Sequence, residues 1–237
     1  MTLDAGRLRR SMTLGEILRG ALALYRRHFR ALLIISVTAL PFSIVSQLGF
    51  ILSAGNRLLV NCLVLLGQVV EIIFIAVLAT AVAHVADHNE IAVGSAFAHV
   101  LRRLGALFLA VVRVLGIVFI LAVTIVGIPF AIFLGVRWAF FTQAVVLEDA
   151  SSGEAQSYSR EIVQGHWWRV FGILLLLWVL GVAVTSPATT ITWTVSRPIG
   201  AILANLIGVI FLPFAAIAYT LLFFDLQSRE REHVSIA

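Results

Sequence analysis

The chain has 237 residues, of which 61% are hydrophobic and only 12% are charged. Soluble domains of ordinary composition hold about 45–50% apolar and about 25% charged residues. A water-soluble globule of this size cannot bury so much apolar side chain, so these values exclude a purely soluble protein and indicate a membrane protein.

The net charge of +5 comes from 17 arginines, because the sequence has no lysine. Most of these arginines lie next to apolar runs, which favours contact with a membrane surface over binding of nucleic acid. Cys62 is the single cysteine and lies within an apolar run, so neither a disulfide framework nor thiol redox chemistry is expected.

Residues 12–30 are predicted to form an amphipathic helix ahead of the first membrane span. Apolar residues recur there at three- and four-residue steps, at Leu14, Ile17, Leu18, Ala21, Leu22, Tyr25 and Phe29. Four arginines fall largely away from that stripe, namely Arg19, Arg26, Arg27 and Arg30. Such a helix lies in the interface with its apolar face toward lipid, and these arginines are expected to contact anionic headgroups.

Six apolar segments are each long enough to cross a hydrocarbon core of roughly 30 Å. They cover residues 31–53, 58–83, 105–128, 129–147, 168–186 and 199–224. The sequence therefore predicts an all-α, polytopic integral membrane helical bundle, a single membrane domain over residues 1–237 with a tail at 225–237. Only Val126-Gly127-Ile128-Pro129 turns the chain between the third and fourth segments, so one long broken helix is the alternative there.

Glu71 lies near the middle of the second span, about 20 Å from either end at 1.5 Å per residue. Glutamate is too short to reach water from that depth. An intramembrane charge costs about 2.5–3.5 kcal/mol on insertion scales, which makes this residue a candidate functional group. Gln68, one turn earlier, shares its helix face and is expected to hydrogen-bond to it.

Two arginines are possible partners for Glu71. Arg137 lies near mid-depth in the fourth span and is favoured, whereas Arg113 lies closer to the end of the third span and can extend its guanidinium to the surface. A Glu71–Arg137 pair that fixes helix register is the simplest expectation. Two alternatives remain for Glu71. It could form a substrate or proton site, or it could face solvent if this helix does not lie in the membrane as assigned.

The segment His84-Val85-Ala86-Asp87-His88 invites a metal-binding interpretation, because histidines at i and i+4 share a helix face and His99 could add a third ligand. The segment falls where the second helix leaves the membrane. A solvated helix end is the simpler interpretation, so no metal and no cofactor is predicted.

Two further stretches have the periodicity of surface helices, residues 93–104 and 155–166, and the second is the weaker. Together with residues 12–30, each precedes a pair of membrane spans. This recurring order predicts an internal repeat of three units, each an amphipathic helix followed by a two-helix hairpin, with threefold pseudo-symmetry.

The last two spans carry anchoring and kinking residues. Trp167 and Trp168 open the fifth span, where indole rings favour the headgroup layer, and Pro213 is expected to kink the sixth.

The predicted loops place 13 arginines on one side of the membrane and two, Arg57 and Arg197, on the other. Both termini are therefore predicted to be cytoplasmic, in a multi-pass protein of the cell (cytoplasmic or inner) membrane.

Four stretches in order resemble the membrane domain that is fused to some glycerophosphoryl diester phosphodiesterases. They also resemble related membrane proteins that stand alone. They are TLGEILRGALALYRRHFRALL with Pro41 after it, GIPFAIFLGVRWAFFTQAVVLE, GEAQSYSREIVQGHWWRVFGILLL, and LPFAAIAYTLLFFDLQSRERE. The likeness places Arg137, Glu148, Ser159 and Asp225 within the family pattern. Arg160 and Gln227 depart from it, which concerns surface contacts more than the fold.

The resemblance implies a membrane fold and no catalytic activity. In the fused proteins hydrolysis belongs to a separate soluble barrel of about 250 residues, and after Phe224 only 13 residues follow here. The sequence also lacks a nucleotide-binding glycine loop, a GxSxG elbow and HExxH. No catalytic residue is therefore predicted.

The leading hypothesis is a non-enzymatic membrane protein that anchors, scaffolds or assists a partner or a lipid process at the cytoplasmic face. Its expected partners are anionic membrane lipids and a membrane or cytoplasmic protein, and nucleic acid is not expected. The alternative is a transporter or channel for a small or lipid-like solute that uses Glu71 and Arg137, with Asn205 among its few other midplane polar residues. An intramembrane enzyme using His84, Asp87 and His88 is the least favoured hypothesis.

Overall fold

The computed structural model describes residues 11–44, 56–88, 93–124, 126–194 and 197–236. Within these residues the chain is all-α, with no strand. Its helices are α1 (Leu14–Arg27), α2 (Phe29–Val37), α4 (Arg57–His88), α5 (Val93–Ala122), α6 (Gly127–Arg137), α7 (Phe141–Leu147), α8 (Ser152–Val163), α9 (Trp167–Thr194) and α10 (Arg197–Ile236). Five helical segments of this part of the chain are long and apolar enough to cross a membrane, or six if the bent pair α1–α2 counts as one span.

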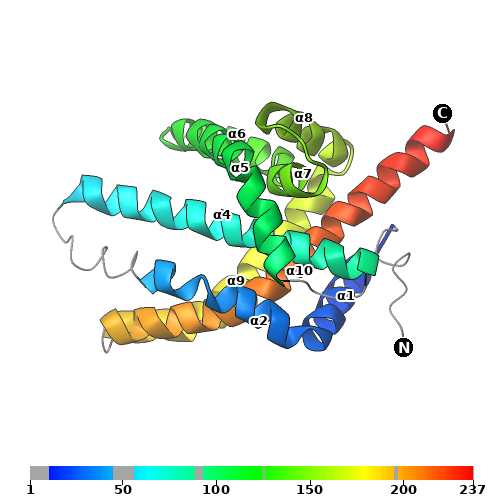
Figure 1. The fold of residues 1–237 in the computed structure, drawn as a ribbon. Coiled ribbons are helices and arrows are strands. Elements are labelled where there is room, and N and C mark those ends of the chain that lie inside the picture. Colours follow the sequence, from blue (N-terminus) through cyan, green and yellow to red (C-terminus); the bar gives the residue numbers. More distant parts are fainter. Residues whose placement is uncertain (1–10, 45–55, 89–92, 125, 195–196, 237) are drawn as a thin grey trace.

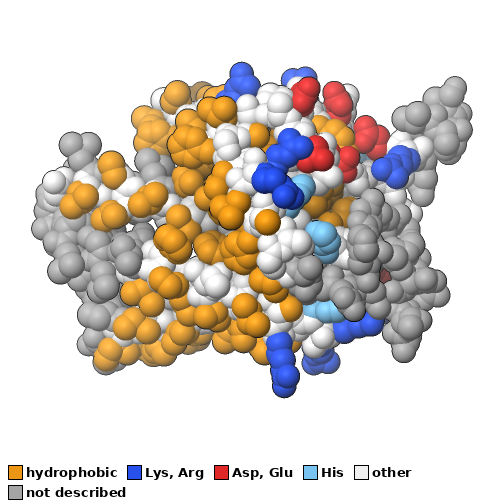
Figure 2. All heavy atoms as spheres, viewed as in Figure 1, with side chains coloured by type: hydrophobic (Ala, Val, Ile, Leu, Met, Phe, Trp, Pro, Cys, Tyr) orange, Lys and Arg blue, Asp and Glu red, His pale blue; other side chains and the backbone are white. Residues whose placement is uncertain are grey.

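The two ends of the molecule differ in polarity. The C-terminal part of α10 lies with α1 and α8 toward one end, called the charged end below (Figure 1). The beginnings of α4 and α10 and the end of α9 form the opposite, apolar end. Figure 2 shows hydrophobic side chains over the apolar half of the visible face and charged side chains gathered toward the charged end. This asymmetry is typical of a bundle whose apolar half lies in lipid.

The hydrophobic core lies toward the charged end. Its fully buried side chains come mainly from residues 76–86 of α4, 140–146 of α7 and 216–226 of α10. By contrast, large apolar side chains elsewhere are exposed, such as Phe119 (65%) and Trp178 (66%). Because exposed aromatic groups of this size belong in lipid rather than water, α5 and α9 present much of their surface to the bilayer.

Helix α1 confirms the predicted amphipathic helix, but part of its apolar face packs against protein. Thr13 and Glu16 form a reciprocal capping box at its first turn, as the Thr-Leu-Gly-Glu sequence favours. Ile17, Ala21 and Leu24 are buried, and α1 packs against α10. The expectation that the apolar face lies toward lipid is therefore wrong for Ile17, Ala21 and Leu24, whereas Leu14 and Leu22 are exposed.

The predicted first span (31–53) is described only as far as Ile44, and the rest lies outside the described residues. Helix α2 follows α1 with a bend of 86° at His28. The chain thus turns sharply within the stretch where the sequence predicted a change from a surface helix to a span.

Helix α5 runs without interruption from Val93 to Ala122, so the surface helix predicted at residues 93–104 is continuous with the third span. The junction Leu104-Gly105 contains no proline and no capping residue. A lone glycine weakens a helix by only about 1 kcal/mol relative to alanine and does not end it.

A tight turn separates α5 from α6, so residues 105–147 belong to two candidate spans and not to one long helix. The Gly127 amide donates to both the carbonyl and the hydroxyl of Thr124 at 3.0 Å. A β-carbon at Gly127 would lie only 1.9 Å from the Leu121 carbonyl oxygen, so no larger residue fits this turn.

The predicted fourth span is broken, because α6 ends at Arg137 and α7 begins at Phe141. Ser159 of α8 satisfies the backbone at this break: its hydroxyl accepts from the Phe140 amide and donates to the Arg137 carbonyl, both at 3.0 Å. The Tyr219 hydroxyl of α10 donates to the Ala139 carbonyl. Side chains from two neighbouring helices therefore replace the missing helical hydrogen bonds.

Helix α8 confirms the third predicted surface helix. A second capping box, formed by Ser151 and Glu154, begins it, and Gly165 at φ +79° separates it from α9. Helix α10 then extends beyond the predicted span to Ile236, so most of the predicted tail is helical. It continues through Pro213, and the Tyr25 hydroxyl donates to the nearby Ile210 carbonyl at 2.8 Å.

Candidate functional site

A cavity of about 360 Å³ lies between residues 39–43, which follow α2, and the helices α4 and α10, and the predicted candidate Glu71 lines it. Gln68 and Glu71 of α4 and Asn205 of α10 provide its main polar side chains. Phe42, which follows α2, and Phe74 of α4 line it with aromatic rings. The cavity thus combines a carboxyl group and carboxamides with a largely apolar wall.

Helical spacing explains how the sequence builds this cavity. Gln68, Glu71 and Phe74 follow one another at three-residue steps, so they share one face of α4. On α10, Asn205 and Leu212 lie along one face, and Gly208 between them has no side chain to fill the space. A β-carbon at Gly208 would meet no atom within 4 Å. The cavity therefore exists partly because a small residue faces the carboxyl group.

The Glu71 side chain is exposed in this structure, and its carboxyl group is accessible from the cavity. In the part of the chain that the structure describes, neither an ion pair nor a hydrogen bond joins Glu71 or Gln68 to another residue, so the expected Gln68–Glu71 hydrogen bond does not form. The rings of Phe42 and Phe74 lie nearby with their centroids 6.5 Å apart. Glu71 is thus a mid-span carboxyl group next to open space and aromatic surface.

Arg137 does not pair with Glu71, so the predicted ion pair is wrong. The break at Trp138–Phe140 places Arg137 beside α8, where its carbonyl accepts from Ser159. Its guanidinium carbon lies 5.4 Å from the centre of the Phe133 ring. The prediction that Arg137 lies near the middle of the membrane assumed an unbroken fourth span. The break between α6 and α7 shows that this assumption was wrong.

Arg113 extends toward α8, as its position near the end of a span suggested. A β-carbon on Gly153 would lie 3.5 Å from Arg113 Nη1. Its long side chain therefore carries the charge to the surface helix while its backbone stays in α5. Neither Arg113 nor Arg137 lines the Glu71 cavity.

All four arginines predicted to contact lipid headgroups have exposed side chains on α1 and at the start of α2. They are Arg19, Arg26, Arg27 and Arg30. Two of them, Arg26 and Arg27, lie in the last turn of α1, where positive charge complements the helix dipole. Their exposure leaves them free to meet headgroups, and contact with lipid stays a prediction.

The histidines near residue 84 do not converge on a metal site in the described residues. The side chains of Asp87 and His88 lie outside the described residues. An imidazole nitrogen of His99 lies 2.8 Å from the Val146 carbonyl oxygen, which ties α5 to the end of α7. The metal-binding interpretation therefore gains no support from His99.

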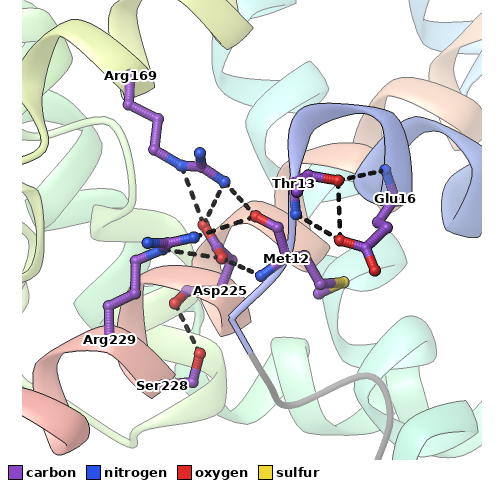
Figure 3. Close-up of polar contacts among 7 residues, drawn as sticks. All are labelled: Met12, Thr13, Glu16, Arg169, Asp225, Ser228 and Arg229. Atoms are coloured by element: carbon purple, nitrogen blue, oxygen red, sulfur yellow. Dashed lines mark hydrogen bonds and ion pairs between the residues drawn. The ribbon is translucent and has the colours of Figure 1, made fainter.

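A polar cluster at the charged end joins three distant parts of the chain (Figure 3). Asp225 of α10 is fully buried, and its carboxylate pairs with Arg169 of α9 at 2.9 Å and with Arg229 at 3.0 Å. It also accepts from the Met12 amide at 2.5 Å, while both arginines donate to the Met12 carbonyl. We call Met12, Arg169, Asp225 and Arg229 the Asp225 cluster.

The Asp225 cluster was missed as a site by reasoning from the sequence, which placed Asp225 only within a family pattern. One signal was present: Asp225 directly follows the apolar run that ends at Phe224. A carboxylate at such a position is buried only if cations accompany it. Arg229, four residues later, was a possible local partner, but nothing in the sequence indicated that Arg169 lies across from it.

A second polar contact fastens α8 to α10. The Gln227 amide donates to Glu148 Oε1 at 2.7 Å and to the Tyr158 hydroxyl at 2.6 Å. Burial raises the pKa of the Tyr158 hydroxyl above its ordinary value, so this group stays neutral near pH 7. Arg103 of α5 pairs with Asp149 in the turn before α8. Surface helix α8 is therefore attached to both α5 and α10 by polar contacts.

Comparisons with known proteins bring no relative of this chain. No protein-family model, curated protein or solved structure matches it. The resemblance to the phosphodiesterase-associated membrane domain therefore stays a prediction from the four sequence stretches.

Proposed function

We propose that this protein is a non-enzymatic integral membrane protein that anchors or assists a partner at the cytoplasmic face of the cell membrane. The observation that carries the proposal is the construction of the charged end. Three elements outside the main apolar bundle, α1, α8 and the end of α10, are held together there by buried and partly buried polar contacts. We call this surface the platform.

Rigid attachment supports a role in presenting a surface. The Asp225 cluster fixes the residues before α1 to α9 and α10. Gln227, Glu148 and Tyr158 fix α8 to the same part of α10. A surface whose elements are already ordered loses little conformational entropy when a partner binds. The platform also carries both signs of charge, with arginines on α1 and carboxylates around α8.

A photo-crosslinking experiment in native membranes tests this proposal. A photoreactive amino acid is placed at Ser157 on α8 or Arg26 on α1, both exposed, and at the lipid-facing positions Trp178 and Phe119 as matched controls. We expect a discrete protein adduct from the platform positions and only lipid adducts from the controls. The same adducts from all four positions, or lipid adducts alone, would contradict a scaffold function.

Transport is a second candidate function, favoured by the cavity that contains Glu71. The densely buried residues of α4, α7 and α10 lie between this cavity and the charged end, so a transporter would have to open that core. Solute flux into reconstituted vesicles is the test. A flux that falls in Glu71→Gln supports transport, and negligible flux of amine, neutral and acidic solutes alike contradicts it.

A further inference from the structure

We propose that the cavity between residues 39–43, α4 and α10 binds the ammonium group of a cationic amphiphile, with Glu71 as its counter-ion. This inference is independent of the scaffold function, and it requires binding only, without passage across the membrane. It is argued in turn from charge, aromatic surface, and size and access.

The charge of the cavity selects a cation. Glu71 is its one ionisable lining residue, since no arginine or histidine of the described chain lines it. A carboxylate in an apolar segment is unfavourable unless a positive group accompanies it. Neither Arg113 nor Arg137 fills that role here, because the Arg113 guanidinium lies beside Gly153 of α8 and the Arg137 guanidinium lies over the Phe133 ring. A ligand that brings its own positive charge completes the pair.

The aromatic surface favours an ammonium group over a metal ion. Phe42 and Phe74 both line the cavity and lie at an interplanar angle of 51°, so their rings form two sides of an angled wall. Ring faces attract alkylammonium groups and supply no ligand atom for a hard metal ion. Gln68 adds a carbonyl oxygen that can accept from an N–H group of a primary ammonium.

Size and access favour an amphiphile. A volume of about 360 Å³ falls at the lower end of the roughly 300–1,000 Å³ of small-molecule sites, which suits a head group with the first carbons of a chain. Phe42, which follows α2, and Leu206 of α10 are exposed beside the cavity, where we expect the surroundings to be lipid. A ligand therefore arrives through the bilayer, and its alkyl chain stays in contact with apolar side chains.

Photolabelling of the purified full-length chain tests the proposal. The protein is reconstituted into phosphatidylcholine nanodiscs and labelled with a twelve-carbon primary amine that carries a diazirine next to the head group. Mass spectrometry of the peptides then locates the label. We expect labelling on the Gln68–Phe74 and Asn205–Leu212 segments, with competition by dodecylamine and dodecyltrimethylammonium but not by dodecanol or dodecanoate.

Two variants, each with a matched control, separate binding from folding. Glu71→Gln keeps the shape and removes the charge, so labelling of these segments at limiting probe should fall roughly tenfold or more. Glu161→Gln makes the same change on exposed α8 and should leave labelling unchanged. Gly208→Leu fills the cavity and should abolish labelling, whereas Gly172→Leu, at an equally open position on α9, should not.

Equal competition by dodecanol, full labelling of Glu71→Gln, or labelling spread evenly along the spans would overturn the proposal. Each variant's thermal unfolding is measured alongside, and Gly208→Leu gives an independent test if Glu71→Gln is unstable.

A final arm replaces part of the phosphatidylcholine with phosphatidylethanolamine. Competition by that lipid identifies a phospholipid head group as the source of the ammonium, and its absence identifies a free amphiphile; either result supports the same chemistry.

Discussion

Asp225 has no exposed surface, yet each of its carboxylate oxygens has partners of opposite charge or a backbone donor. A buried carboxylate with this many partners is stable as an ion, whereas removing the charge leaves two guanidinium groups crowded around a neutral amide. The residue therefore links the N-terminal segment to α9 and α10.

We expect Asp225→Asn to lower the free energy of unfolding by about 2–3 kcal/mol. This value is below the about 3–5 kcal/mol typical of a fully buried broken pair, because Arg169 and Arg229 are partly exposed and water screens them. Thermal unfolding in detergent measures the effect. Asp149→Asn, in the exposed pair with Arg103, is the control and should cost less than about 1 kcal/mol. Equal losses in both variants would rule out a special role for Asp225.

Ser159 is a second residue whose loss should be costly. Ser159→Ala leaves the Phe140 amide and the Arg137 carbonyl without their partner at the break between α6 and α7. An unsatisfied buried group costs about 1–3 kcal/mol. The exposed neighbour Ser157→Ala should change the unfolding midpoint little, and a similar midpoint for both variants would show that water replaces the serine hydroxyl.

At the scale of elements, the start of α8 should depend on pH. Hydrogen bonds from the Ser151 side chain and backbone lower the pKa of Glu154 below its ordinary value. A depressed folded pKa means that the stabilisation is fully present above the ordinary value of 4.5 and is lost as the pH falls through the folded pKa. Amide exchange in the first turn of α8, corrected for its intrinsic pH dependence, should therefore become faster under acid conditions. Glu154→Gln should remove this step, and a step that persists would implicate another group.

The spans were predictable from the sequence because each depends on a long apolar run, and the all-α bundle follows directly. The positions at which helices bend, continue or break were not predictable in this way. The break after Arg137 is satisfied by the distant side chains of Ser159 and Tyr219, which no local pattern indicates. The 86° bend at His28 and the absence of a break in α5 were likewise not predicted from the local sequence. The junctions between the predicted surface helices and the spans differ from one another, with a bend at His28, no break in α5 and a turn at Gly165. The predicted threefold pseudo-symmetry therefore stays a prediction.

The candidate site was predictable in part for a similar reason. Glu71 and Gln68 stood out because polar residues are rare in apolar runs, and Asn205 was noticed on the same ground. Phe42 and Gly208 carry no such signal, because apolar and small residues are ordinary in spans. Arg137 was misplaced because its depth follows from the break in its helix and not from its position in the sequence.

At the scale of the whole molecule, the unequal polarity of the two ends makes a topological prediction. The predicted cytoplasmic termini require α8 to face the cytoplasm and the end of α9 to face the opposite side. In a Cys62→Ala background, we expect Ser157→Cys to react with a membrane-impermeant maleimide only in inverted vesicles. Thr194→Cys should react only in right-side-out vesicles. Reaction of both positions from one side would contradict an odd number of crossings between them.

The contact between Met12 and Asp225 joins residues 213 positions apart. A ribosome releases Met12 near the start of synthesis and Asp225 near its end, so α1 has no docking partner while most of the protein is being made. Ile17, Ala21 and Leu24 are uncovered throughout that interval, although the finished molecule buries them. Insertion of α10 is consequently the step that completes assembly. A chain stalled before this step would expose the apolar face of α1 to chaperones and quality-control proteases.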